Sequence, residues 1–228
     1  MTKDNVYVIN RNAWFQKMPG LLLFLEEKAL LDRVLKNKRG NDLLQVGGPE
    51  DPRLIENARV FRTFFLDAKV RSHHSKSFIQ AAADCLPIQS ESIDIFLCLH
   101  ELETASNPKA ILKEAYRVLR PNGQLIIVGL NRWSLWQLLH RGNNPALLRS
   151  PGKIKRYLRK VNFDIVMHET ACFRPPFKNI ETAKSFLFLE TLGQFFLPYA
   201  GAVYMLVATK NIPGMTPLIV SNFQSARV

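Results

Sequence analysis

Cysteine is scarce in this chain, and the few cysteines are not grouped. Cys85, Cys98 and Cys172 lie far apart, without a CxxC pair and without histidines at metal-ligand spacing. This distribution argues against a disulfide framework and against a zinc site, so we expect no bound metal. Free cysteines of this kind are typical of proteins in the reducing cytoplasm, and we expect a cytoplasmic location.

The chain also lacks an N-terminal apolar signal core, because it opens with the polar run MTKDNVYVINRNAW. Export by a standard signal peptide is therefore not expected. Long apolar runs are rare as well. The segment closest to a membrane span is Phe186 to Ala208, which contains Glu190, Gln194 and Pro198. A buried helix followed by a core strand accounts for it better than a transmembrane helix.

Acidic residues are few relative to basic ones, at 19 against 31, which gives a net charge of +12. Such a surplus favours an anionic partner, for which nucleic acid, a phosphorylated metabolite and an anionic membrane surface remain open. Residues 132–178 hold ten basic side chains and two acidic ones. Helix 153–160 within this segment has an apolar face and basic outer faces, which fit either a solvated surface or an anionic partner.

Hydrophobic residues make up 47% of the 228, enough for a sizeable core, and we expect one domain spanning 1–228. Strands 93–99 and 124–130 are apolar apart from Asp94 and Gln124, and they flank an amphipathic helix at 108–119. Apolar strands alternating with helices predict an α/β fold with a mainly parallel sheet covered on both faces. We expect a helix at 21–35 and further strands at 42–48, 61–66, 77–82, 163–173 and 201–210. Ligands bind such sheets at the carboxyl ends of the strands.

A group of short motifs between Asp84 and Leu130 gives the chain a family resemblance. In order they are Leu86-Pro87-Ile88, Ser92-Ile93-Asp94, Glu114, Arg117-Val118-Leu119-Arg120 and Pro121-Asn122-Gly123. With this order and spacing the chain resembles class I S-adenosylmethionine-dependent methyltransferases of the type-11 domain family. Through GLNRWSLW, FRPP, GAVYMLVATK and IPGMTP it is also similar to an uncharacterised gammaproteobacterial group of methyltransferase-domain proteins.

The resemblance implies a Rossmann-like seven-stranded sheet, mainly parallel, in which 201–210 is the antiparallel strand. It also implies three parts of the one domain: an N-terminal helical segment at 1–40 closing over the site, a cofactor-binding core at 41–130, and substrate-side helices with the last two strands at 131–228. The implied cofactor is S-adenosylmethionine, and the implied activity is methyl transfer to a small-molecule acceptor.

By the same resemblance the cofactor site is expected to consist of Gln45, Gly47, Gly48, Asp67, Ala82, Ala83 and Leu99. Asp67 would take the ribose hydroxyls, and the Ala82-Ala83 pair would lie against adenine. The turn departs from the family pattern, because Gln45 replaces an acid and Pro49 and Glu50 follow Gly48. Pro49 has no amide and Glu50 adds negative charge, so we expect weaker cofactor binding than in a typical member.

On the acceptor side, His100 leaves the fourth strand at its carboxyl end and is a candidate general base. The sequence HELET lacks the second histidine of a zinc HExxH motif. Substrate-binding candidates are Trp14, Asn131, Trp133 and Arg174, and a structural ion pair remains the alternative for Arg174. Ser92 and Asp94 are expected to organise the turn into the fourth strand.

Three functions stay open: a small-molecule methyltransferase, an RNA-directed methyltransferase using residues 132–178, and a binding protein that has lost catalysis. An NPPY motif, which would favour the second, is missing. The oligomeric state and the acceptor are left open.

Overall fold

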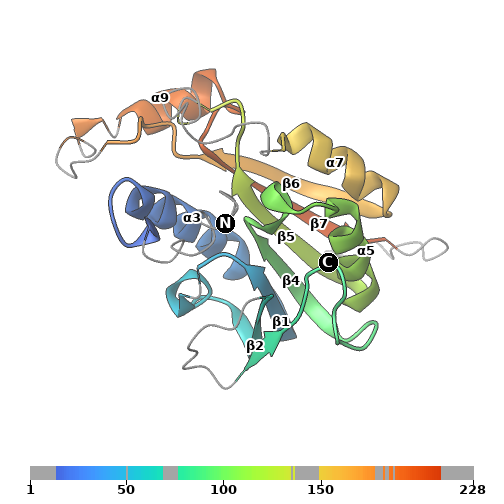
Figure 1. Cartoon of the computed structure of the whole chain (residues 1–228). Helices are drawn as coiled ribbons and strands as arrows, with labels where there is room; N and C mark the ends of the chain where they lie inside the picture. Colours follow the sequence, from blue (N-terminus) through green and yellow to red (C-terminus); the bar gives the residue numbers. More distant parts are fainter. Residues whose placement is uncertain are drawn as a thin grey trace, which may run out of the picture.

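The structure is a computed structural model of the chain, and it describes residues 14–49, 51–68, 77–134, 136, 149–177, 182, 185, 186 and 188–211. These residues contain a seven-stranded sheet of order β3-β2-β1-β4-β5-β7-β6 (Figure 1). β7 is antiparallel to β5 and β6, and the remaining pairs are parallel. This confirms the expected sheet. The strands are β1 (Arg39–Gly47), β2 (Arg59–Asp67), β3 (Phe78–Gln80), β4 (Ile93–Leu99), β5 (Leu119–Leu130), β6 (Phe163–Ala171) and β7 (Val203–Lys210).

Helices cover both faces of the sheet, which explains why its central strands bury apolar residues on both sides. Successive strand residues point to opposite faces, so Leu43 belongs to one core cluster and Leu44 to the other. α3 (Gly20–Leu35) packs on the first face, while α5 (Pro108–Val118) and α7 (Pro151–Lys160) pack on the second (Figure 1). The shorter elements are η1 (Pro52–Leu54), α4 (Glu101–Thr104) and α9 (Phe188–Phe196).

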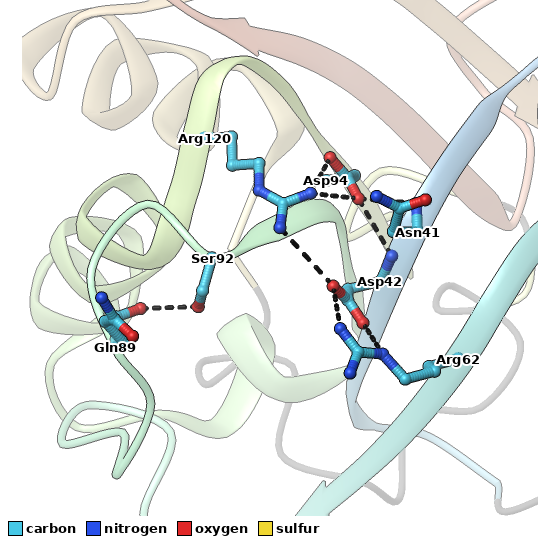
Figure 2. A network of polar contacts seen from close by, with 7 residues as sticks. All are labelled: Asn41, Asp42, Arg62, Gln89, Ser92, Asp94 and Arg120. Carbon is cyan, nitrogen blue, oxygen red and sulfur yellow. Dashed lines mark hydrogen bonds and ion pairs between the residues drawn. The ribbon is translucent and has the colours of Figure 1, made fainter.

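Asp94 joins the amino-terminal ends of the central strands (Figure 2). Its carboxylate accepts hydrogen bonds from the amides of Asn41 and Asp42, at 2.7 and 2.9 Å, and from the Arg120 guanidinium at 2.8 Å. Asp42 in turn accepts a hydrogen bond of 2.6 Å from Arg62. Burial raises the pKa of Asp94, but the amides and Arg120 outweigh it and hold that pKa below its ordinary value. Asp94 thus stabilises the end of the sheet opposite the carboxyl-end rim.

The other family-like motifs also hold structure together. Arg117 on α5 donates to the carbonyls of Leu86 and Ile88, at 3.0 and 2.8 Å, and pairs with Glu114. Ser92 Oγ donates to a carbonyl of the preceding turn at 2.7 Å, as Figure 2 shows. The expectation that Ser92 and Asp94 organise the entry into β4 is confirmed.

Two expectations about local structure need correction. β5 begins at Leu119 rather than at residue 124, because 120–123 bulge within the strand between the pairs Ile93–Leu119 and Ile95–Gln124. α9 is a short helix that precedes a core strand, yet none of its residues is buried. Among the described residues, no helix combines the length and apolar character needed to cross a membrane.

Candidate functional site

The carboxyl ends of four parallel strands bring the predicted site residues to one rim of the sheet. β1 ends at Gly47, β2 at Asp67, β4 at Leu99 and β5 at Leu130. In the sheet these strands follow the order β2-β1-β4-β5 and each is hydrogen-bonded to the next, so the four ends are adjacent. In open α/β sheets this rim is where ligands bind.

The turn after β1 requires glycine at two successive positions. Gly47 and Gly48 have φ of 71° and 76°, in the left-handed region that other residues avoid. A Cβ on Gly47 would lie 2.6 Å from the Leu99 carbonyl oxygen, and one on Gly48 would lie 2.5 Å from Leu99 Cβ. The turn therefore packs directly on the end of β4, which is the role of Leu99 in this structure.

Gln45 is 1% exposed and its amide shapes the same turn. Its Nε2 donates to the carbonyls of Gly47 and Pro49, at 3.2 and 3.0 Å. A carboxylate cannot donate to these carbonyls, so glutamine at this position is matched to the bent-back turn. Gln45 Oε1 has no hydrogen-bond partner among the described residues. It is a buried acceptor next to the glycine turn, and leaving such an atom unpaired costs about 1–3 kcal/mol.

A small, shallow pocket lies beside this turn, with about 190 Å³ of empty space that is partly open solvent. It is lined by Gln45, Gly47, Gly48, Phe65, Leu66, Asp67 and Phe78. The structure thus brings four of the predicted cofactor residues together and adds Phe65 and Phe78, which sequence reasoning missed. Ala82 is exposed, Ala83 is buried, and neither lines the pocket.

His100 lies at the end of β4, where both of its ring nitrogens meet carboxylates. Nε2 is 2.9 Å from Glu27 Oε1 of α3, and Nδ1 is 3.0 Å from Glu103 Oε1 of α4. His100, Glu27 and Glu103 are 6%, 0% and 5% exposed. Burial alone would lower the pKa of His100, but the two carboxylates outweigh it and raise that pKa to about 10. The ring is therefore an imidazolium at neutral pH.

This geometry does not favour His100 as a general base, because an imidazolium with both N–H groups engaged has no lone pair for another proton. Instead His100 ties α3 to the carboxyl end of β4. Sequence reasoning missed its two partners. Glu27 could have been noticed, since it shares the buried helix face of Leu23, Leu30 and Val34. Within the described ranges, no group of three acidic, histidine or cysteine side chains is arranged to hold a metal ion.

The remaining acceptor-side candidates are Asn131, Trp133 and Trp14, and they differ in exposure. Asn131 is buried, and its Nδ2 donates to the carbonyls of Tyr199 and Gly201 at 2.7 and 3.0 Å. Trp133 is 74% exposed and Trp14 is 41% exposed. Asn131 therefore fixes the segment after α9, while the two tryptophans present aromatic surface to solvent.

Arg174 is 6% exposed and belongs to a buried ion-pair network. Its guanidinium pairs with Glu26 of α3 and, at 3.4 Å, with Glu190 of α9. Its carbonyl accepts a hydrogen bond of 2.6 Å from Trp136 Nε1. The structural alternative fits Arg174 better than the substrate-binding one, because its charge is already paired with two carboxylates of this chain.

Comparison with known proteins gives this rim a context. A family profile described as "Methyltransferase domain" matches residues 59–127. An uncharacterised protein of Methanocaldococcus jannaschii is 38% identical over 65 residues, which span 28% of this chain and 32% of that protein. The chain thus aligns with about a third of the length of that curated relative.

Solved structures share the fold at low sequence identity. A SAM-dependent methyltransferase of Archaeoglobus fulgidus superposes with a TM-score of 0.60 at 16% identity, covering 91% of this chain and 100% of that one. The [4+2]-cyclase SpnF superposes with a TM-score of 0.55 at 18% identity, covering 81% and 80% of the two chains. The described sheet therefore has the class I methyltransferase fold, and residues 59–127 within it match the methyltransferase domain family.

Proposed function

We propose that this protein is an S-adenosylmethionine-dependent methyltransferase acting on a small-molecule acceptor. The observation that carries the proposal is the pocket at the end of β1 and β2, where a glycine turn, a buried unpaired acceptor and an acidic residue meet. Its position at the carboxyl ends of the strands, together with the match over residues 59–127, supports the same reading.

The lining residues fit the cofactor in chemistry. Gln45 Oε1 would accept a hydrogen bond from the cofactor's ammonium group, and the turn of Gly47 and Gly48, whose Cβ positions face Leu99, would border the cofactor with its backbone. Asp67 would bind the ribose hydroxyls, with Phe65 and Phe78 as apolar walls. The empty space of about 190 Å³ includes open solvent and leaves no enclosed room for a ligand, so we expect lining side chains to move on binding.

When bound, the cofactor supplies an activated methyl group on its sulfonium, so the protein needs no nucleophile of its own. The chain's residues would orient the acceptor in line with that methyl and exclude water. In this proposal His100 is a positioning residue that holds α3 over the rim, and Asn131 sets the segment that borders it. Trp14 and Trp133 would offer aromatic contact to the acceptor.

Three other functions are distinguishable from this one. SpnF, a structural neighbour, is named for a cyclisation, and the fold alone does not specify methyl transfer. A binding protein without catalysis would retain the fold but would not transfer a methyl group. An RNA-directed enzyme would use the exposed lysine and arginine side chains of α7. The proposal also includes a cytoplasmic location and the likeness to the gammaproteobacterial group, to which the archaeal relative adds no support.

Calorimetric titration of S-adenosylmethionine and S-adenosylhomocysteine into the purified protein tests the proposal. We expect binding of both, abolished by Gly47→Val and weakened by Asp67→Ala by about 1–3 kcal/mol through lost hydrogen bonds to the ribose. Asp164→Ala is the matched control, because Asp164 lies at the amino-terminal end of β6, away from the rim. Absence of binding for both ligands, or equal losses for Asp67→Ala and Asp164→Ala, would refute it.

A further inference from the structure

An exposed apolar surface runs along α9 and the residues that follow it. Its large side chains are Phe188, Leu192, Phe195, Phe196, Leu197 and Tyr199, which are 54%, 45%, 79%, 69%, 63% and 69% exposed. The acid of this helix, Glu190, is turned inward and accepts hydrogen bonds from the amides of Cys172 and Phe173, at 2.6 and 3.0 Å. The outer side of 188–199, here called the α9 face, therefore carries no charged side chain.

The α9 face continues onto the rim of the candidate site. Asn131 Nδ2 holds the Tyr199 carbonyl at 2.7 Å, and Thr170 Oγ1 donates to the Pro198 carbonyl. Trp133, two residues after Asn131, adds a 74% exposed indole. Isolated exposed apolar residues are ordinary, whereas a contiguous group of this kind marks an interaction surface.

Basic side chains border the α9 face on two sides. The ring of His168 stacks on Tyr199 at 5.3 Å between centroids and accepts a hydrogen bond of 2.9 Å from Lys155 of α7. The Arg132 guanidinium lies 5.7 Å from the Trp133 ring. α7, which packs on the other face of the sheet beside β6, carries four further exposed basic side chains, Lys153, Arg156, Arg159 and Lys160. Both α7 and α9 flank β6, as Figure 1 shows.

We propose that the α9 face docks this protein on the surface of an anionic lipid membrane. Its phenylalanines and leucines would enter the boundary between headgroups and acyl chains, and Trp133 and Tyr199 would lie at the headgroup level. The lysines and arginines of α7, with Arg132, would meet the lipid phosphates, as a net charge of +12 favours. This proposal stands on its own, independent of catalysis.

Two other partners fit the surface less well. Single-stranded RNA would use the basic and aromatic residues, but exposed Leu192 and Leu197 would find no matching partner on it. A second copy of the chain would bring two basic α7 borders together in a symmetric pair, where like charges repel. A membrane surface satisfies both the apolar and the basic parts at once.

Vesicle flotation with the full chain tests the proposal. The probes are vesicles of phosphatidylcholine alone and vesicles with phosphatidylglycerol as a substantial minority component, at low and at high salt. We expect binding to the anionic vesicles that is at least about tenfold tighter than to the neutral ones and that weakens with salt. Vesicle binding without any dependence on charge or salt, or no binding at all, would overturn the proposal.

Paired variants locate the binding surface. Phe195→Ser with Leu197→Ser should reduce binding at least about tenfold, whereas Phe61→Ser, at an 88% exposed position on β2, should not change it. Arg156→Glu with Arg159→Glu should reduce binding to anionic vesicles, and Arg59→Glu, exposed at the start of β2, is the matched control. Equal effects in variant and control would contradict the placement. So would displacement of the vesicles by RNA, or dimers in light scattering that only the α9 variants dissociate.

Discussion

Replacing Glu27 by glutamine should destabilise the protein and change how its stability depends on pH. Glu27 is fully buried, 2.9 Å from the His100 ring, and belongs to a helix 73 residues away in sequence. The substitution keeps the shape of the side chain but removes one of the two charges that stabilise the imidazolium. Removing one partner of a buried ion pair costs about 3–5 kcal/mol, and we expect about 3, because glutamine Oε1 can still accept the N–H.

The pH dependence follows from the raised pKa of His100, which burial lowers but Glu27 and Glu103 raise from 6.5 to about 10. Below pH 6.5 His100 is protonated in both the folded and the unfolded state, and its ion pairs with Glu27 and Glu103 contribute fully to stability. Between pH 6.5 and about 10, His100 keeps its proton in the folded state but has lost it in the unfolded state. Stability therefore falls as pH rises, by up to about 1.4 kcal/mol per pH unit from this group.

Urea unfolding across this pH range, together with an NMR titration of the histidine rings, measures both effects. Glu27→Gln should bring the pKa of His100 toward its ordinary value. The difference in unfolding free energy between the variant and the natural protein should therefore shrink as pH rises. Glu56→Gln is the matched control, since Glu56 is 51% exposed and pairs with Lys28 on the surface. That control should change stability by less than about 1 kcal/mol. A His100 pKa near 6.5 in the natural protein would refute the reasoning.

Two further predictions concern groups outside the rim. Asp94→Ala should lower the free energy of unfolding in urea by about 2 kcal/mol, because two backbone amides and Arg120 lose their acceptor, and it should leave the calorimetric affinity for S-adenosylmethionine unchanged. A changed affinity would contradict the placement of Asp94 at the far end of the sheet. Burial, and to a smaller extent Lys155, lowers the pKa of His168 from 6.5 to about 4. The contribution of neutral His168 to folding stability is therefore complete above pH 6.5 and is lost as the pH falls toward 4. In acid-unfolding curves, His168→Gln should remove about 1 kcal/mol of this acid sensitivity, and an unchanged profile would contradict the assignment.

Local sequence patterns predict much of the fold. The apolar runs of β4 and β5 and the amphipathic α5 between them predict buried parallel strands, because strands covered on both faces have no polar side. The antiparallel β7 followed from the family resemblance rather than from periodicity. The glycine turn and Asp67 lie at the rim because parallel strands end at the same edge of a sheet, while their role in binding a cofactor stays a prediction.

The chemistry of the rim depended on tertiary contacts. His100 looks like a free histidine at a strand end until α3 brings Glu27 to its ring, and Gln45 looks like a weakened cofactor residue until its amide is seen to hold the turn carbonyls. The apolar run around α9 predicts burial, yet the helix is anchored by Glu190 and leaves its phenylalanines exposed. Periodicity records which residues share a face of one element. Which element that face meets, and whether it meets any, is decided by contacts between residues far apart in the chain, such as the Glu27–His100 pair.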